Sequence, residues 1–408
     1  VLENLVISKA KLKPIINWLA EERQLTQFME KMPFKVSLEA RVSSLAAGEK
    51  QKVEILKQLF LQNRILILDE PTSVLTPQEA DEVLGHLRAM TRARQISVLI
   101  ITHKLREVVT FADEVTVLRK GQFVGSGLVS DLTVAQMAEM MMGSEFTTKP
   151  KERSAPPAKT PKLAIHDLRV HDDAGVEAVR GLHVTIHSGE IVGVAGVSGN
   201  GQRELVEVLA GQRQAVAGKI LVQGMPFEPT REQIVRHKIY CLPEEPLQNT
   251  CVGNMSLAEN LAFRNFDRVP HAVGGWLINH PALRRSAHGL IERYNIKPPS
   301  PDTPIRSLSG GNVQRAVLAR ELSDGVEILI IANPCFGLDF LATDEIRLQI
   351  VAARNRGTAV LLLSEDLDEI LELADRTVVM FNGQLVYETT SSGADLALIG
   401  RHMTGHAA

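Results

Sequence analysis

Short apolar runs rich in β-branched residues recur along the chain, separated by segments with helical periodicity. A run that is apolar at every position is typical of a strand buried on both faces of a parallel sheet. The predicted strands are Ile65 to Leu68, Ser97 to Ile101, Val115 to Leu118, Ile191 to Val194, Ile328 to Ile331 and Val360 to Leu363. Amphipathic helices are predicted between them, over Pro77 to Thr91 and Asp344 to Asn355. This alternation predicts an α/β fold with a mainly parallel sheet.

Several short sequence motifs occur twice along the chain in the same order, which indicates an internal repeat. The matching pairs are Val1 to Leu5 with Leu257 to Leu261, Leu45 to Glu49 with Leu308 to Asn312, and Phe111 to Asp113 with Leu373 to Asp375. The spacing also agrees, because 24 positions separate Leu45 from Asp69 and the same number separates Leu308 from Ala332. We therefore expect two homologous domains.

A segment without apolar periodicity divides the two copies. Residues 144–162 are rich in Pro, Lys, Ser and Thr, as in a linker. The predicted domains are 1–143 and 163–408, which suits a chain of 408 residues.

Composition narrows the class of protein. With 45 basic and 48 acidic residues the net charge is −3, which disfavours nucleic-acid binding. The cysteines, Cys241, Cys251 and Cys335, have no zinc-type spacing and cannot all pair, which favours a reducing compartment. The apolar runs fall short of the ~20 residues that cross a bilayer. A role at a membrane therefore requires partner subunits.

Two adjacent carboxylates, Asp69 and Glu70, follow the first predicted strand. Side chains at the carboxyl end of a parallel strand face the ligand crevice. One carboxylate there can hold Mg²⁺ and the next can polarise an attacking water. His103 follows the next strand, where it could reach a transferred phosphoryl group. On residue chemistry alone, an ordinary acidic strand exit and a structural histidine remain alternatives.

A glycine-rich turn joins the strand at Ile191 to Val194 to a helix expected to begin near Glu204. Backbone N–H groups in such a turn, together with a helix N-terminus, bind phosphate. The candidate phosphate-binding residues are Gly196, Ser198, Gly199, Asn200, Gly201, Gln202 and Arg203. A phosphate loop usually ends in Lys and Ser or Thr, but Gln202 has no charge and Arg203 has no metal-binding hydroxyl. We expect nucleotide binding with Mg²⁺ held poorly.

A serine and two glycines precede a helix predicted over Val313 to Leu322. This start, with Ser309, Gly310, Gly311 and Asn312, can donate N–H groups and a hydroxyl to a γ-phosphate presented by another domain. A capped helix with a glycine-rich turn is the structural alternative.

In this order and spacing, the motifs resemble the ATP-binding-cassette (ABC) family over essentially the whole chain, and the tandem form resembles importers of simple sugars and nucleosides. The resemblance implies two nucleotide-binding domains of the P-loop NTPase type, each with antiparallel β and helical subdomains. It implies that Asp69 is the magnesium-side carboxylate, directly or through water. Glu70 would be the catalytic carboxylate and His103 the switch histidine. The segment Leu308 to Asn312 resembles an intact ATP-binding signature.

Several positions depart from the family pattern. The degenerate counterparts are Ala332, Asn333 and Glu365 in the second copy and Ala46, Ala47 and Gly48 in the first signature. In this family ATP lies between one cassette's phosphate loop and the other's signature, so all departures fall on one site. The site that combines Glu70 and His103 with Ser309 is then the competent one.

The first copy shows no glycine-rich phosphate loop. Because Gly196 lies 112 positions before Leu308, the equivalent loop is expected about 67 positions before Val1. We expect residues 1–143 to be the C-terminal part of a first cassette that lacks its Walker A loop, in a chain that is a fragment. The absent part would correspond to roughly Lys162 to Ser256. Without it, we expect apolar surface to be left exposed around Ile65 to Leu68 unless the remainder is supplied.

The implied function is the ATP-binding and ATP-hydrolysing subunit of an importer, with ATP and Mg²⁺ as cofactors. The stretch Leu242 to Pro246, with Met255 to Asn260 after it, resembles the region through which cassettes contact membrane partners. The implied partners are two transmembrane permease subunits and, through them, a solute-binding protein, at the cytoplasmic face of the cell membrane. A catalytically inactive nucleotide-binding fragment or regulatory partner is the alternative. A tandem cassette acting on ribosomes or DNA is disfavoured by the short, mildly basic linker.

Overall fold

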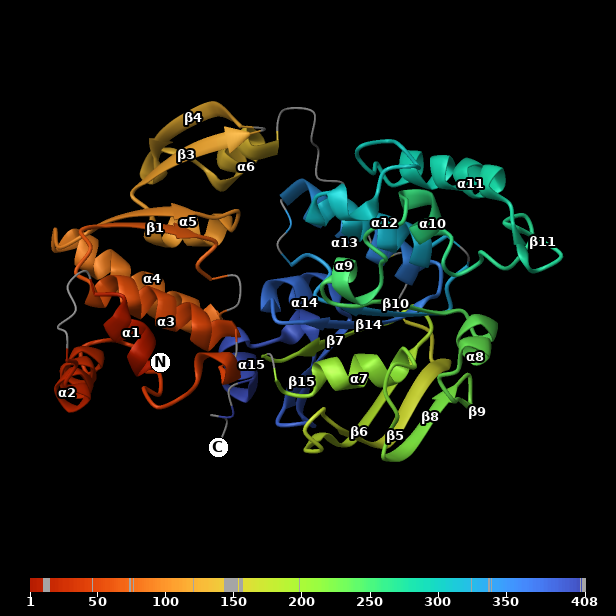
Figure 1. Ribbon diagram of the computed structural model, residues 1–408, viewed down its shortest axis with the longest axis horizontal. Coiled ribbons are helices and arrows are strands. Elements are labelled where there is room, and N and C mark those ends of the chain that lie inside the picture. The colour runs from red at the N-terminus through yellow and green to blue at the C-terminus, as the bar shows by residue number, and fades with distance from the viewer. Residues whose placement is uncertain are drawn as a thin grey trace. The chain divides into compact units, whose positions relative to one another are not determined.

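The computed structural model describes the chain except residues 10–14, 46, 73, 74, 76, 120, 143–152, 154–156, 198, 324, 337, 339, 404 and 406–408. The chain divides into two compact units, Val1–Lys149 and Pro150–Ala408 (Figure 1). Most of the expected linker, residues 144–162, lies outside the described residues. The first strand of the second unit begins at Pro161, shortly before the expected domain start at residue 163.

The first unit contains two short sheets with helices. Its helices are α1 (Leu2–Ile7), α2 (Trp18–Met29), α3 (Ala47–Phe60), α4 (Pro77–Arg92), α5 (Leu105–Phe111) and α6 (Val134–Met142), with 3₁₀ turns η1 (Val42–Ser44) and η2 (Val129–Asp131). Its strands are β1 (Ile65–Asp69), β2 (Ser97–Ile101), β3 (Glu114–Arg119) and β4 (Gln122–Leu128). Strands β1 and β2 pair in parallel, whereas β3 and β4 form an antiparallel pair.

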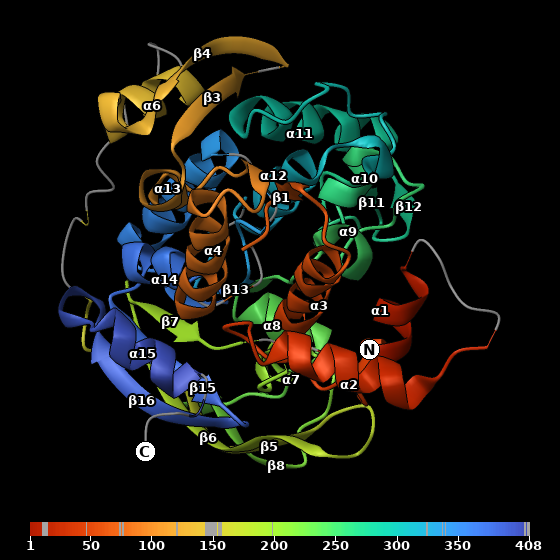
Figure 2. The ribbon, with the colours of Figure 1, turned by 90° about the vertical axis from the view of Figure 1, so that its left-hand side faces the viewer.

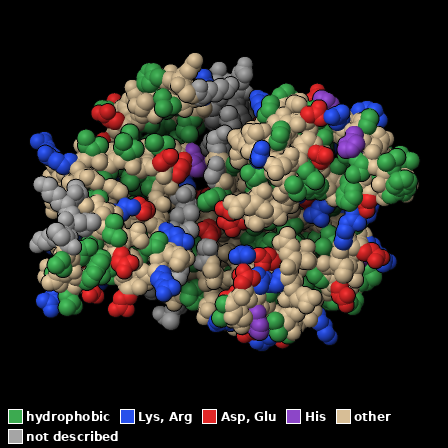
Figure 3. All heavy atoms as spheres, viewed as in Figure 1, with side chains coloured by type: hydrophobic (Ala, Val, Ile, Leu, Met, Phe, Trp, Pro, Cys, Tyr) green, Lys and Arg blue, Asp and Glu red, His purple; other side chains and the backbone are tan. Residues whose placement is uncertain are grey.

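Only one face of the β1–β2 sheet is buried. Leu66 and Leu68 pack in the core that α3 and α4 share, but Ile65 and Ile67 are 73% and 67% exposed. Leu99 on β2 is likewise 57% exposed, and hydrophobic side chains reach the surface of this unit (Figure 3). The expectation of strands buried on both faces is therefore wrong for β1 and β2, because no described element of the unit covers their second face. The expectation of exposed apolar surface around Ile65 to Leu68 is confirmed. It is also wrong for β3, which lies in the antiparallel pair and is only partly buried.

The second unit contains the larger sheets. Its strands are β5 (Pro161–His171), β6 (Glu177–His187), β7 (Ile191–Ala195), β8 (Ala217–Val222), β9 (Met225–Pro226), β10 (Ile239–Leu242), β11 (Ala272–Val273), β12 (Leu277–Ile278), β13 (Ile328–Ala332), β14 (Ala359–Ser364), β15 (Arg376–Phe381) and β16 (Gln384–Thr390). Its helices are α7 (Gln202–Leu209), α8 (Arg231–Arg236), α9 (Pro246–Asn249), α10 (Leu257–Leu261), α11 (His280–Arg293), α12 (Gly310–Glu321), α13 (Phe340–Asn355), α14 (Leu367–Leu373) and α15 (Leu396–Met403), with 3₁₀ turns η3 (Ile305–Ser307) and η4 (Ser391–Gly393).

The central sheet of this unit has six strands in the order β10-β13-β14-β7-β15-β16. Its neighbours run parallel except β16, which returns antiparallel to β15. A four-stranded antiparallel sheet, β6-β5-β8-β9, forms a separate layer, and α15 packs on β15 and β16 (Figure 2). The predicted α/β architecture with a mainly parallel sheet is confirmed.

Both faces of the central sheet are covered. Leu329 and Ile331 of β13 pack in a core with α12 and α13, whereas Ile328 and Ile330 pack in a second core with α7 and the antiparallel sheet. Every residue of β13 and β14 is buried. The repeat aligns β1 with β13, so the exposed face of β1 corresponds to the face that α7 and the antiparallel sheet cover in the second unit.

The predicted helices form with small changes at their starts. Helix α13 begins at Phe340, four residues earlier than predicted, and α7 begins at Gln202 rather than near Glu204. Helix α10 is fixed by a capping box, in which Ser256 accepts from Glu259 N and Glu259 accepts from Ser256 N. Among the described residues, no helix combines the length and the apolar character that spanning a membrane would need.

The three cysteines are free thiols. Burial raises the pKa of Cys241 to about 12 and that of Cys251 to about 11. These two side chains therefore remain protonated at neutral pH, and neither is a reactive thiolate.

Candidate functional site

The strand exits of the first unit bring Glu70 and His103 together. Glu70 follows β1 with a φ of 46°, and its N–H donates to Ile101 O at 2.9 Å. The Nδ1 atom of His103, which follows β2, lies 2.8 Å from Glu70 Oε1. Both side chains are about one-third exposed, at 32% for His103 and 35% for Glu70. A left-handed non-glycine residue stores backbone strain, which recurs at functional sites.

The second unit repeats the same turn with different side chains. Asn333 follows β13 with a φ of 45°, and its N–H donates to Leu363 O at 2.8 Å. Its Oδ1 accepts from Glu365 N at 3.0 Å. The backbone of the two exits is thus equivalent, but an amide stands where the first unit has a carboxylate. An amide cannot accept a proton from water as a carboxylate can.

Asp69 ends β1 with an exposed side chain. Within the parts of the chain that the structure describes, no three His, Cys, Asp or Glu side chains gather to hold a metal ion. Mg²⁺ in nucleotide sites is usually held by one or two carboxylates together with substrate phosphates. Asp69 fits such a ligand, whereas the methyl group of Ala332 does not.

A buried carboxylate behind the strand exit was not predicted from the sequence. Glu107 on α5 is 5% exposed and accepts hydrogen bonds from Thr72 Oγ1 and, at 3.1 Å, from Thr102 Oγ1. In the second unit Glu369 accepts from Ser364 Oγ at 2.7 Å. Both glutamates lie five positions after a hydroxyl residue at the strand exit, which is Thr102 directly after β2 and Ser364 at the end of β14. That shared spacing is the signal by which they could have been found.

The glycine-rich turn of the second unit is a tight backbone loop. Gly199 and Gly201 adopt φ values of 90° and 96°, and a Cβ on Gly201 would lie 2.3 Å from Ala178 O. Asn200 holds the loop in place, because its Oδ1 accepts from Asn382 N at 2.9 Å. The loop leads directly into α7, so its backbone amides and the N-terminus of α7 fit a phosphate group.

Two side chains at the start of α7 do not fit Mg²⁺. Gln202 turns back into the loop, with Nε2 3.4 Å from Gly196 O. Arg203 points along the helix instead, where its Nε donates to Glu207 at 2.7 Å. Neither supplies a hydroxyl or a carboxylate to a metal, so the described residues of this loop fit phosphate but not its magnesium. Ser198 lies outside the described residues.

Glu244, in the loop after β10, lies beside the altered strand exit. Partial burial raises the pKa of Glu244, although a hydrogen bond with Asn333 and the nearby charge of Arg203 act in the opposite direction. The structure therefore groups Glu244, Asn333 and Arg203 within the second unit. Sequence spacing alone did not predict the contact between Glu244 and Asn333.

The serine-glycine segment opens α12. Ser309 is the N-cap residue, and its hydroxyl accepts from Asn312 Nδ2 at 2.9 Å. A Cβ on Gly310 would meet nothing within 4 Å, so the helix start is open. In the first unit α3 begins at Ala47 directly after η1, as α12 follows η3, with Gly48 in its first turn. Ala46 and the side chain of Ala47 lie outside the described residues.

Comparison with known proteins identifies the family. A profile of the ABC transporter family matches residues 1–73 and 179–335, which together make up more than half of the chain. The chain belongs to the ABC transporter family. This membership makes it an ATPase subunit whose hydrolysis is coupled to transport.

This ABC transporter chain is similar to several import ATP-binding proteins. It is 40% identical to the glucose import ATP-binding protein of Haloferax volcanii over 388 residues, which cover 94% of the chain and 70% of the relative. It is 33% identical to the nucleoside import ATP-binding protein of Lactococcus lactis, covering 94% of the chain and 76% of the relative. It is 34% identical to the guanosine import ATP-binding protein of Bacillus subtilis, covering 98% of the chain and 79% of the relative.

Proposed function

We propose that this chain is the ATP-binding and ATP-hydrolysing subunit of an importer for simple sugars or nucleosides, with one competent and one degenerate ATP site. The names of its relatives, which import glucose, nucleosides and guanosine, support the substrate class. The solute itself is selected by other subunits, because a cassette carries no solute site.

The observation that carries the proposal is the difference between the two strand exits. The turn is the same, but Glu70 and His103 are joined at 2.8 Å in the first unit, whereas Asn333 accepts from the Glu365 backbone in the second. A carboxylate held by a histidine can orient and polarise an attacking water. We infer that hydrolysis takes place only at the site that uses Glu70.

In the competent site, each residue has a separate role. Glu70 orients the attacking water and His103 holds the Glu70 carboxylate in place. Ser309, with the N–H groups of Gly310 and Gly311, binds the γ-phosphate at the start of α12. Asp69 would hold Mg²⁺, which would supply positive charge to the phosphate oxygens. The degenerate site combines the Gly196 to Arg203 loop with the altered signature at Leu45 to Glu49, and binds nucleotide without turning it over.

The proposed partners are two transmembrane permease subunits and, through them, a solute-binding protein. The protein then works at the cytoplasmic face of the cell membrane and touches the membrane only through these subunits. The resemblance of Leu242 to Pro246, and of Met255 to Asn260, to the contact region of other cassettes supports this arrangement.

The proposal is tested by ATP hydrolysis in the assembled importer complex. Replacing Glu70 by Gln should lower kcat by about 100-fold or more, because general-base contributions are of that order. Replacing Asn333 by Ala should change kcat by less than about twofold. Equal losses in the two variants would refute the asymmetric assignment. A wild-type complex that binds ATP without hydrolysing it would instead support the alternative of an inactive nucleotide-binding subunit.

A further inference from the structure

Beyond the nucleotide residues, an ion cluster lies at the far end of α12 from Ser309. Glu321, the last residue of α12, is fully buried and accepts from Arg264 Nη2 at 2.7 Å and from Arg320 Nε at 2.7 Å. Arg264 follows α10, 57 positions earlier in the chain. Burial opposes the charge of Arg264, but Glu321 holds the pKa of its guanidinium above the ordinary value.

The same cluster fixes the segment that precedes α10. Arg320 donates to Thr250 O at 2.9 Å and to Thr250 Oγ1 at 2.6 Å. The side chain of Asn260, 2% exposed, closes the intervening loop by accepting from Val252 N at 2.9 Å and donating to Val252 O at 3.1 Å. The segment from Thr250 to Arg264 and the end of α12 are therefore held together by charge-assisted hydrogen bonds.

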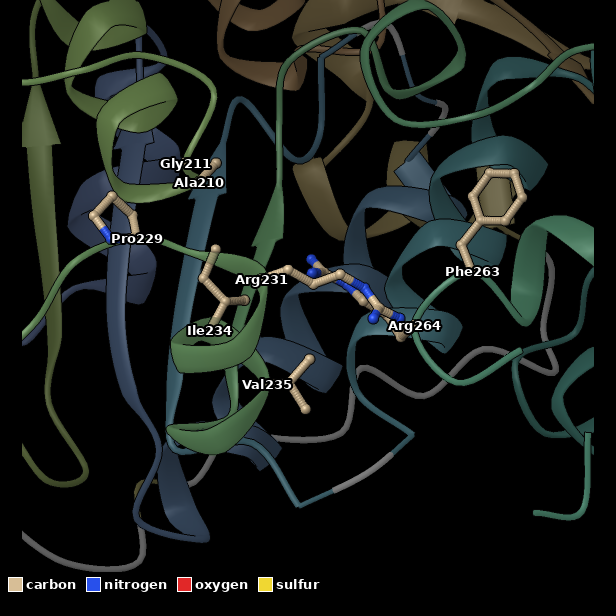
Figure 4. A pocket seen from close by; sticks show the side chains of 8 residues that line it. All are labelled: Ala210, Gly211, Pro229, Arg231, Ile234, Val235, Phe263 and Arg264. Atoms are coloured by element: carbon tan, nitrogen blue, oxygen red, sulfur yellow. The ribbon is translucent and has the colours of Figure 1, made fainter. Parts of the chain in front are cut away.

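Arg264 also faces an open space. A pocket of about 280 Å³ lies between α8 and the end of α10, lined by Arg231 and Ile234 on one side and by Phe263 and Arg264 on the other. Figure 4 shows the Arg231 side chain extending from α8 toward Arg264. Arg231 pairs with Asp267 at 2.9 Å, and no bond from it to α12 is found among the described residues. Of the two arginines that line the pocket, Arg264 is therefore the one that connects it with the buried end of α12.

The repeat supplies an internal comparison. The alignment places Lys57 and Gln58 of α3 where α12 has Arg320 and Glu321, and Ser8 where the second unit has Arg264. Lys57 pairs with Glu54 on its own helix, and Gln58 accepts from Asn63 at 2.9 Å. The three-membered ion cluster thus accompanies the helix with the intact signature, and the helix with the altered signature has different chemistry at each of the three positions.

We propose that Arg264 and Glu321 are positioning residues that set the placement of Ser309 and the first turn of α12. A helix of 12 residues is about 18 Å long, and almost all of α12 beyond its first turn is buried. Packing along this helix couples its two ends, so a clamp at its C-terminus also limits local opening of the helix and thereby holds the hydroxyl and N–H groups at its N-terminus. This inference rests on the proposed function only in assigning those groups to ATP.

Hydrogen–deuterium exchange of the full chain tests the inference without requiring turnover. Replacing Arg264 by Gln should speed the exchange of amides 313–318 by about tenfold, because the clamp that limits opening of this helix is lost. The matched control is Arg231→Gln, which removes the other arginine of the pocket and leaves α12 clamped, so its exchange there should equal wild type. If the Gln variant fails to fold, Arg264→Lys replaces it, and its single ammonium nitrogen, in place of the two guanidinium nitrogens that bond Glu321, should give an intermediate rate.

Two results would overturn the inference. Exchange in the Arg264 variant could match that of the Arg231 control, or it could rise uniformly over the whole second unit, which would show general destabilisation. In the assembled importer, the Arg264 variant should lower kcat with KM for ATP little changed. If the wild-type complex does not hydrolyse ATP, the proposed function fails, but the exchange result still decides the role of the clamp.

Discussion

Two glycines of the glycine-rich loop before α7 allow backbone strain and steric clash to be measured separately. Gly199 has a φ of 90°, and a Cβ added there would meet open space. Gly201 has a φ of 96°, and a Cβ added there would lie 2.3 Å from Ala178 O and 2.9 Å from Met380 Cε. Gly199→Ala therefore introduces only left-handed strain, at the low end of the ~1–3 kcal/mol range for such positions. Gly201→Ala adds an overpacking cost of about 1–3 kcal/mol.

The expected totals are about 1 kcal/mol for Gly199→Ala and about 3 kcal/mol for Gly201→Ala. A unit of this size loses roughly 2–4 °C in Tm per kcal/mol. In differential scanning calorimetry of the full chain, the Tm of the second unit should then be lower by about 2–4 °C in Gly199→Ala and by about 6–12 °C in Gly201→Ala. Equal shifts would refute the argument, because they would mean that the contact with Ala178 does not constrain the loop.

Two further predictions concern the exposed sheet face and a buried ion pair. Ile67→Lys should leave the Tm of the first unit nearly unchanged and reduce its aggregation and its binding of a hydrophobic dye, because the Ile67 side chain is 67% exposed. Leu66→Lys should instead unfold the unit, because Leu66 is only 3% exposed. Equal destabilisation by the two substitutions would mean that the Ile67 face is covered. Burial alone would raise the pKa of Glu190, but hydrogen bonds led by that from Arg376 hold it below its ordinary value of 4.5. The stability it contributes is therefore present above pH 4.5 and is lost as the pH falls through the lower folded pKa. In urea unfolding, Glu190→Gln should lower the free energy of unfolding by about 2 kcal/mol at pH 7 and by progressively less below pH 4.5. Glu388, the exposed partner of the same arginine, should tolerate replacement by Gln with little change in this free energy at either pH. An effect of Glu190→Gln that does not depend on pH would contradict this assignment.

The sequence predicted the strands better than their surroundings. Ile65 to Leu68 and Ile328 to Ile331 are apolar throughout, which is enough to identify two strands, and both form. Burial of both faces could not be deduced from the run itself, because it depends on what packs against the strand. Ile67 is exposed and its repeat partner Ile330 is buried, although the two local sequences are almost the same.

The same contrast between local sequence and packing applies to the residues of the site. Glu70 and His103 were predicted to face one crevice because neighbouring parallel strands end at the same edge of a sheet. In the structure, Glu70 Oε1 lies 2.8 Å from His103 Nδ1. The partnership of Arg264 with Glu321 joins the turn after α10 to the end of α12, and neither charge belongs to a recognisable motif. Such a pair can be found only once the packing of the helices is known.

The turn at Asn333 has a consequence for how activity could be lost or regained. Asparagine is among the residues that tolerate a left-handed backbone, so the second unit keeps the bend of a catalytic strand exit while lacking its carboxylate. Converting Asn333 to Asp or Glu would restore the acid on a backbone that already has the required shape. The missing metal ligands are a greater obstacle, because Ala332, Gln202 and Arg203 would all have to change. Loss of hydrolysis through missing metal ligands is therefore harder to reverse by single substitutions than loss of hydrolysis through a missing carboxylate base.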